Sequence, residues 1–182
     1  METFAPARAF VSHPTYKQDR KRVLASLDME AVDDPIRGLI NAFNGLPQCF
    51  TLQCCYGHFL HAAQTDPHNI ERLPAQDMGQ VQYRIAYLAL CIENSAPGHR
   101  LRRQLETVPQ IAAEYVQFGS PDWFWEQQPN TYALQVEPNA QRGKDVATIG
   151  YREALQVEEV RDLFFDRIAE VLQAASMDLG AA

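Results

Sequence analysis

The sequence lacks the features of membrane and secreted proteins. None of its apolar runs approaches the roughly 20 residues that a membrane-spanning helix needs. Its first residues show no basic segment followed by a long apolar stretch, so we expect neither a membrane association nor a cleaved signal peptide. Only 4 cysteines occur among 182 residues, too few for a disulfide scaffold in a chain of this length. Free thiols and a cytoplasmic location are the resulting expectation.

Three widespread nucleotide-binding and catalytic motifs are also absent. No Gly-x-Gly-x-x-Gly follows a predicted strand, and no Gly-x-x-x-x-Gly-Lys-Ser/Thr occurs. Dinucleotide-binding and P-loop folds are therefore disfavoured, because their phosphate sites depend on those glycines. Gly-x-Ser-x-Gly is missing too, which disfavours a hydrolase with a nucleophile elbow.

Basic residues are not in excess, since the net charge is −7. This balance disfavours a general nucleic-acid binder. Two local clusters of positive charge remain: Lys17, Arg20, Lys21 and Arg22, and His99, Arg100, Arg102 and Arg103. Such clusters are ordinarily solvated helix faces. The functional alternative is that the first cluster forms a polyanion-binding surface.

Hydrophobic periodicity predicts a single α+β domain over residues 1–182. Helices are expected at 14–27, 33–44, 97–108 and 157–175, and strands at 48–57, 81–93, 115–118, 123–126, 131–137 and 145–151. This order favours a mixed or mainly antiparallel sheet with an N-terminal helical pair and a C-terminal helix packed on it. Residues 1–13 read as a loosely ordered lead-in, and 176–182 as a tail. The C-terminal helix has a clear apolar stripe: Val157, Val160, Phe164, Ile168 and Val171.

The most informative segment is the predicted strand at 48–57 with the residues that follow it. Period-two alternation puts Phe50, Leu52, Cys54 and Tyr56 on one face, so we expect Cys54 to be buried. Cys55 is then expected on the opposite face, nearer a cavity. A long connection at 60–80 follows, of a length that is often functional.

Cys55 and His58 form a candidate catalytic pair, three residues apart across a glycine turn. A thiolate nucleophile needs a neighbouring imidazole, although a buried inert thiol is more common. A metal site built from Cys54, Cys55, His58 and His61 has suitable ligand types. We predict no metal there, because consecutive strand residues point to opposite faces and the spacing fits no usual ligand pattern.

The aromatic segment at 123–125 has two interpretations. Its tryptophans could stack on bases, but filling a core or closing a sheet edge is the more ordinary role, and we favour it.

Residues 17–59 resemble the start of the wybutosine-synthesising protein 3 family. The likeness consists of a basic helix running to Leu27-Asp28, a helix over 33–44, Leu46-Pro47, and a strand ending in Cys54-Cys55-Tyr56-Gly57-His58. Of the family's strand motif, Thr51, Cys55 and Gly57 match directly. Cys54 stands where the family has serine, and His58 where it has arginine. The resemblance implies S-adenosylmethionine as methyl donor, a tRNA guanosine derivative as acceptor, and an α+β fold unlike the Rossmann fold.

Three functional hypotheses follow. The leading one is a divergent S-adenosylmethionine-dependent tRNA methyltransferase-like protein that binds a nucleoside-containing ligand near the end of strand 48–57. Its residues would be Cys55 and His58 for catalysis, Thr51, Gly57 and His61 for the ligand, and Lys17, Arg20, Lys21 and Arg22 for a polyanion such as tRNA. The second is a non-catalytic domain that binds a small molecule or a protein. The third is a thiol enzyme that uses Cys55.

Overall fold

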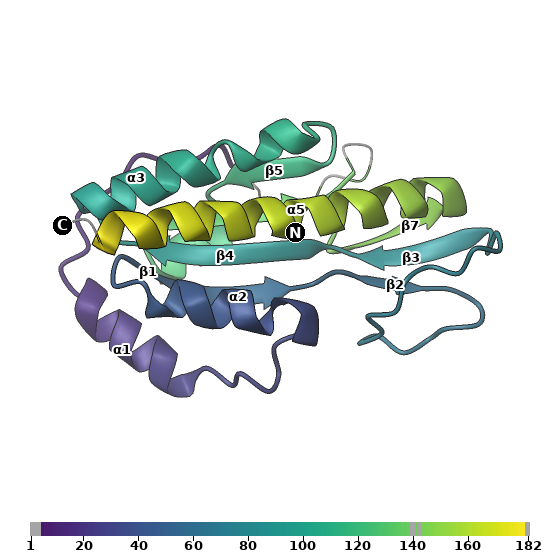
Figure 1. Cartoon of the computed structure of the whole chain (residues 1–182), viewed down its shortest axis with the longest axis horizontal. Helices are drawn as coiled ribbons and strands as arrows, with labels where there is room; N and C mark the ends of the chain where they lie inside the picture. Colours follow the sequence, from purple (N-terminus) through teal and green to yellow (C-terminus); the bar gives the residue numbers. More distant parts are fainter. Residues whose placement is uncertain (1–4, 139–140, 142, 181–182) are drawn as a thin grey trace.

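The computed structural model describes residues 5–138, 141 and 143–180. Its helices are α1 (Tyr16–Ser26), α2 (Asp34–Gly45), α3 (Ala96–Leu105), α4 (Asp122–Gln127) and α5 (Tyr151–Gly180), with a 3₁₀ turn at Val108–Ile111. Its strands are β1 (Cys49–Cys55), β2 (His58–Leu60), β3 (Gln80–Arg84), β4 (Ala86–Ile92), β5 (Val116–Gly119), β6 (Thr131–Val136) and β7 (Val146–Gly150). The prediction of an α+β domain is confirmed (Figure 1).

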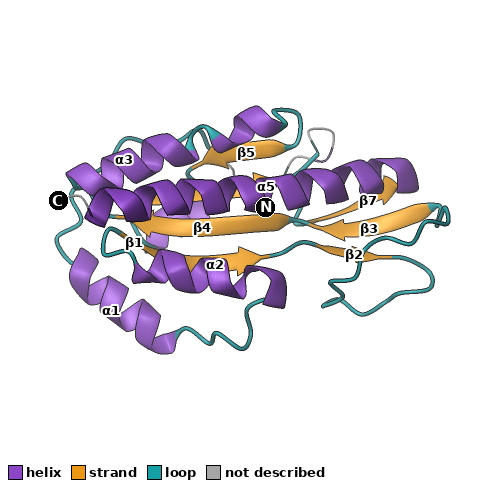
Figure 2. Cartoon of the chain, in the orientation of Figure 1, coloured by secondary structure: helices purple, strands orange, loops and turns teal. Residues whose placement is uncertain are grey.

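The strands form two antiparallel sheets, one with the order β1-β4-β6-β5 and a smaller one with the order β2-β3-β7. The sheets lie end to end, and α5 runs along both (Figure 2). The single strand predicted at 81–93 is in fact two strands that separate at Ile85. Tyr83 fixes this break, because its hydroxyl accepts from the Ala86 N–H and donates to the Val136 carbonyl.

The two faces of the four-stranded sheet are covered by different helices. The front face, toward the viewer in Figure 1, holds the main core, where Leu88, Leu90 and Ile92 of β4 share one hydrophobic cluster with buried residues of α2, α3 and α5. On the back face, α1 packs on Phe50 and Cys91. The side chain of Phe124 in α4 covers Ala89 and Ala133 on that same back face.

A β-bulge in β1 overturns the prediction for Cys54 and Cys55. The register with β4 shifts between Thr51 and Gln53, so one extra residue enters the strand. The alternation is therefore broken, and Cys54 joins the front cluster instead of lying with Phe50 on the back face. Cys54 is only partly buried, whereas Cys55 is buried, which reverses the expected order.

The segment predicted as a strand at 123–126 is helix α4. Pro121 precedes it and Asp122 lies in its first turn, both favourable at a helix start. Phe124 is buried, Trp125 packs against the main core and Trp123 is exposed, so the core interpretation fits two of the three rings.

The C-terminal helix is longer than predicted at both ends and buries the expected stripe: Val157, Val160, Phe164, Ile168 and Val171. At the other end of the chain, two contacts hold the lead-in to the rest of the domain. Pro6 forms an isolated β-bridge with Gly119, and the Val11 N–H donates to Asn130. No helix in the described part of the chain is long and apolar enough to cross a membrane.

Candidate functional site

A compact group of three side chains occupies the end of β1. Asp33 precedes α2, Cys55 ends β1 and His58 begins β2, and their potential ligand atoms all lie within 4.8 Å of one another. His58 Nε2 is 3.4 Å from Asp33 Oδ2. The Tyr56 N–H also donates to that carboxylate, at 2.8 Å. The structure thus brings the predicted pair together and adds a third group that the sequence did not pair with it.

Ionisation of the group is set by its internal contacts. Hydrogen bonding to Asp33, and then to Cys55, raises the pKa of His58 to about 10, although burial works in the opposite direction. Burial by itself would raise the pKa of Asp33, but its hydrogen bonds with His58 and the Tyr56 N–H outweigh burial and lower it. At neutral pH, His58 and Asp33 therefore form an imidazolium–carboxylate pair.

Arg161 of α5 fixes the turn that joins Cys55 to His58. Its side chain is almost fully buried and donates to the Gly57 carbonyl at 3.2 Å. The guanidinium lies 4.1 Å from the centre of the Tyr56 ring and 5.2 Å from that of Phe59. Its partner carboxylates are Asp162, at 2.9 Å, and Glu158, at 3.9 Å. The turn is thus a buried part of the core, held to α5 by the contacts of Arg161.

Gly57 is required by the packing of this turn. Its φ of 92° lies in the left-handed region, and a Cβ added there would come within 2.9 Å of the Ala86 Cβ. Both the backbone and the available space therefore favour glycine. Ala86 thus occupies the space beside Gly57, where the sequence led us to expect a ligand.

Two further predicted ligand-binding residues do not join the group. Thr51 is fully buried, and its N–H donates to Asn44. His61 lies in a turn in which its backbone pairs with that of Gln64. Neither residue lines the two cavities described below. The structure gives no support to the ligand-contact role expected of Thr51, because no part of the residue reaches the surface.

The predicted polyanion-binding residues on α1 divide into two kinds. Lys17, Lys21 and Arg22 are exposed. Arg20 instead turns inward and donates to the backbone carbonyls of Cys49, Asn44 and Leu46, at 3.2, 2.5 and 3.2 Å. Arg20 thus holds the connection between α2 and β1, and its role as a phosphate contact is not supported.

A cavity of about 440 Å³ opens on the back face of the four-stranded sheet, beside α4. Its floor consists of polar side chains from three adjacent strands, and its rim consists of aromatic and charged ones. The lining residues are Gln53, Arg84, Ile85, Tyr87, Pro121, Trp123, Phe124, Ala133, Gln135 and Asp145. The Tyr87 hydroxyl donates to Gln53 at 3.2 Å, so the floor is already partly ordered.

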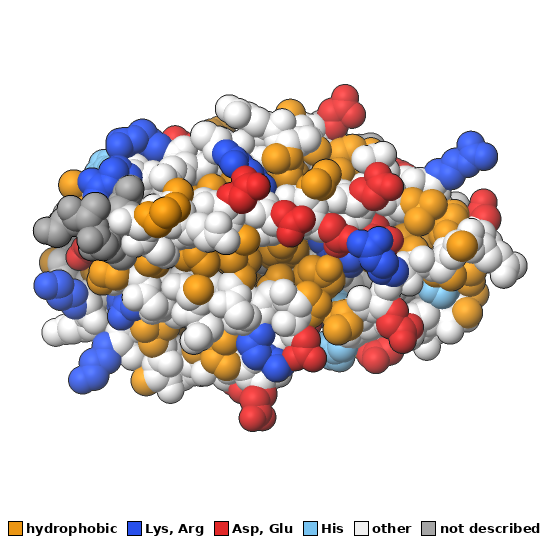
Figure 3. Space-filling model, in the orientation of Figure 1, with side chains coloured by type: hydrophobic (Ala, Val, Ile, Leu, Met, Phe, Trp, Pro, Cys, Tyr) orange, Lys and Arg blue, Asp and Glu red, His pale blue; other side chains and the backbone are white. Residues whose placement is uncertain are grey.

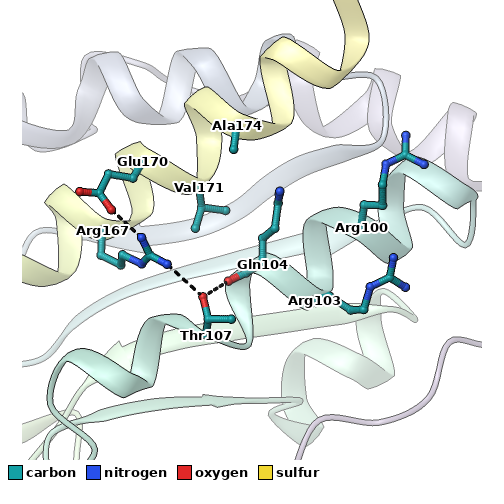
Figure 4. Close-up of a pocket in the computed structure, with 8 residues that line it drawn as sticks. All are labelled: Arg100, Arg103, Gln104, Thr107, Arg167, Glu170, Val171 and Ala174. Atoms are coloured by element: carbon teal, nitrogen blue, oxygen red, sulfur yellow. Dashed lines mark hydrogen bonds and ion pairs between the residues drawn. The ribbon is translucent and has the colours of Figure 1, made fainter. Parts of the chain in front are cut away.

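A second cavity, of about 400 Å³, lies between α3 and α5 (Figure 4). Arg100 and Arg103 extend from α3, and Arg167 of α5 points toward Thr107. Arg167 is paired with Glu170 at 2.6 Å and reaches Thr107 at 3.4 Å. Much of the charge of Arg167 is therefore neutralised by a partner within the protein.

Sequence reasoning missed Asp33 and Arg161 as members of the region around the β1 end. In the sequence, Asp33 is only a helix-start signal. Arg161 lies on the apolar face of α5, four residues after Val157 and three before Phe164. A lone basic residue at a position of the apolar stripe was the available signal.

The comparisons with known proteins returned no matching family model and no matching curated protein. Two solved structures of the PH1069 protein from Pyrococcus horikoshii are similar in fold. One is 15% identical, with 92% of this chain and 95% of that chain covered and a TM-score of 0.45. The other is 14% identical, with 93% and 95% covered and a TM-score of 0.46.

Proposed function

We propose that this protein binds a nucleoside-containing ligand in the cavity on the back face. In this role it is a divergent S-adenosylmethionine-dependent, tRNA methyltransferase-like protein. The observation that carries the proposal is the composition of the cavity: aromatic rings, two amides and a pair of opposite charges surround a volume of about 440 Å³. A volume of this order is typical of small-molecule sites. Gln53 belongs to β1, so the cavity lies close to where the sequence placed a ligand.

The lining supplies the contacts that a nucleoside requires. Trp123 is 49% exposed and offers a ring face for stacking a base. Gln53 and Gln135 carry both donors and acceptors, as recognition of a base edge demands. Asp145 can accept hydrogen bonds from ribose hydroxyls, and Arg84 can hold a carboxylate or a phosphate.

Methyl transfer to a bound nucleoside needs mainly alignment of donor and acceptor. Among the described lining residues there is no cysteine or histidine. The proposal therefore assigns no covalent step to the protein, and Cys55 and His58 do not take part as reacting groups.

The basic face of α1 is the surface on which we propose that RNA binds. Helix α1 packs on the same back face as the cavity, and Lys17, Lys21 and Arg22 are exposed there. Figure 3 shows basic side chains grouped at the end of the molecule where α1 and α3 lie, and acidic ones over the middle of α5. This asymmetry would orient a polyanion toward one end of the molecule despite the negative net charge.

Calorimetry with S-adenosylmethionine and guanosine tests ligand binding. Losing a stacking ring costs about 1–3 kcal/mol per base, so Trp123→Ala should raise the Kd about 5- to 150-fold. Leu163→Ala is the control, because it removes an apolar side chain that is 55% exposed on α5. A wild-type chain that binds neither compound at millimolar concentration, or a Trp123→Ala variant with unchanged affinity, would overturn the proposal.

A non-catalytic binding domain is the alternative, and the lack of a cysteine or histidine among the described lining residues favours it. Transfer of a labelled methyl group from S-adenosylmethionine to unmodified tRNA separates the two functions. Ligand binding with no transfer would leave the binding domain as the function.

A further inference from the structure

We propose that Asp33, Cys55 and His58 form a zinc site, separate from the back-face cavity. Three donors of different kinds converge there from three segments of the chain, within 4.8 Å of one another. Thiolate, imidazole and carboxylate are the three groups with which proteins bind zinc. None of these residues lines the back-face cavity, so the proposal stands independently of the nucleoside-binding function.

The orientation of His58 suits coordination. Its Nδ1 lies 3.0 Å from the backbone carbonyl of Asn69. A carbonyl oxygen can only accept, so Nδ1 carries the hydrogen in this contact. In the neutral ring the lone pair is then on Nε2, the atom that faces Asp33. Metal-bound histidines commonly donate their other N–H to a backbone carbonyl in this way.

The spacing of the imidazole and carboxylate donors is that of two ligands around one ion. Two atoms about 2.0–2.1 Å from a tetrahedral zinc ion stand about 3.3–3.4 Å apart. Nε2 and Oδ2 are 3.4 Å apart, a long hydrogen bond but a good tetrahedral edge. The Tyr56 N–H holds the carboxylate at 2.8 Å, so a second donor of the set is also oriented by the backbone.

The surroundings favour a resident ion with a structural role. The side chains of His58 and Asp33 are only 2% and 17% exposed, and Cys55 is buried. One Zn²⁺ would balance one thiolate and one carboxylate around a neutral imidazole. Protons held on the donor atoms would pass to solvent on binding. The exposed His68, whose ring centre is 6.2 Å from that of His58, or a water molecule can complete the fourth position.

The ion would tie together the start of α2, the end of β1, β2 and the 61–79 connection, which contributes Asn69 and His68. Cys54 and His61, the other two residues of the metal site that was considered and rejected from the sequence, are not part of this set. Cys54 packs in the front cluster, and His61 lies outside the group. These two residues therefore provide matched controls, one thiol and one imidazole.

Cobalt substitution tests the site. Metal-free protein titrated with Co²⁺ should develop a near-ultraviolet thiolate-to-cobalt band, which Zn²⁺ abolishes and millimolar Mg²⁺ does not, because thiolate disfavours magnesium. Elemental analysis of the chain purified without chelators should give close to one equivalent of zinc. Cys55→Ala should lose the band entirely, whereas Cys54→Ala and His61→Ala should retain it. His58→Ala and Asp33→Asn should weaken Co²⁺ binding, with folding checked by circular dichroism.

Several outcomes would overturn the zinc site: no cobalt band in the wild-type chain, displacement by Mg²⁺, or a band that survives Cys55→Ala. The wild-type titration keeps the test decisive even if a variant fails to fold. Because S-adenosylmethionine binding is measured separately, failure here leaves the nucleoside proposal standing, and the reverse also holds.

Discussion

Gly57 illustrates how one residue type can serve a purpose different from the one expected of it. Gly57 was expected to contact a ligand, but Ala86 lies beside it, with its Cβ 2.9 Å from the point that a Cβ on residue 57 would occupy. The φ of 92° at Gly57 adds a second constraint that a side chain would violate.

Gly57→Ala is therefore expected to destabilise the protein by about 1–3 kcal/mol, the usual scale for a residue held in a disfavoured backbone region. Urea unfolding followed by circular dichroism measures this. Gly38→Ala is the matched control, because Gly38 lies within α2 with nothing within 4 Å of an added Cβ. That change should stabilise by about 0.5–1 kcal/mol. Equal effects of the two substitutions would contradict the role given to Gly57.

The candidate site was only partly predictable at this scale. Cys55 and His58 could be paired, because they are close in sequence and separated by a glycine. Asp33 could not, since α2 and β1 intervene and only their packing returns the start of α2 to the end of β1. The exposure of the thiols was predicted in reverse, because the bulge in β1 leaves no signal in the alternation of apolar residues.

Among the elements, α5 was the most predictable, because a long stripe of apolar residues at helical spacing indicates a helix with one buried face. It spans Tyr151–Gly180 and packs against α3 and both sheets. Phe164 is fully buried in the middle of this stripe.

Phe164→Ala should destabilise the protein by about 3–5 kcal/mol, as expected for loss of a buried aromatic ring together with the cavity it leaves. Leu163→Ala, one residue away but 55% exposed, should change stability by no more than about 0.5 kcal/mol. Thermal and urea unfolding of both variants measure the difference. Similar melting of the two variants would mean that the helix does not pack as described.

Two other elements show where local patterns fail. The Trp-Phe-Trp run has strand propensity, yet the proline and acid before Trp123 start a helix, and the back face of the sheet accepts Phe124. The apolar run at 81–93 reads as one strand, although a tyrosine hydroxyl at position 83 breaks it between two sheets. Both outcomes depend on tertiary partners that no local window contains.

At the scale of the whole molecule, the order of helices and strands was enough to predict the fold class. Strands and helices do not alternate regularly in this chain, as they do in a fold built from βαβ units. The division into two sheets was not predictable, since it depends on the breaks at Gly57 and Ile85. The charge distribution was visible in the sequence as clusters, but only the structure separates Arg20, which is bound to three carbonyls, from its exposed neighbours.

This separation gives a test of the proposed contact with RNA. If Lys17 and Lys21 each meet a phosphate, replacing both with alanine should weaken tRNA binding. The replacement should also reduce the slope of log K against log salt concentration by about 1.4–1.8, because each contact contributes about 0.7–0.9. Filter binding or fluorescence anisotropy over a series of salt concentrations measures that slope.

Lys144→Ala is the charge control, because Lys144 is exposed on the connection between β6 and β7, away from α1. It removes a charge without touching the proposed surface, so its slope should match the wild type. Arg20→Ala is unsuitable as a probe, since it would release the α2–β1 connection and lower stability. An unchanged slope in the Lys17/Lys21 variant, or an equal loss in Lys144→Ala, would show that any RNA binding is diffuse attraction rather than contact with α1.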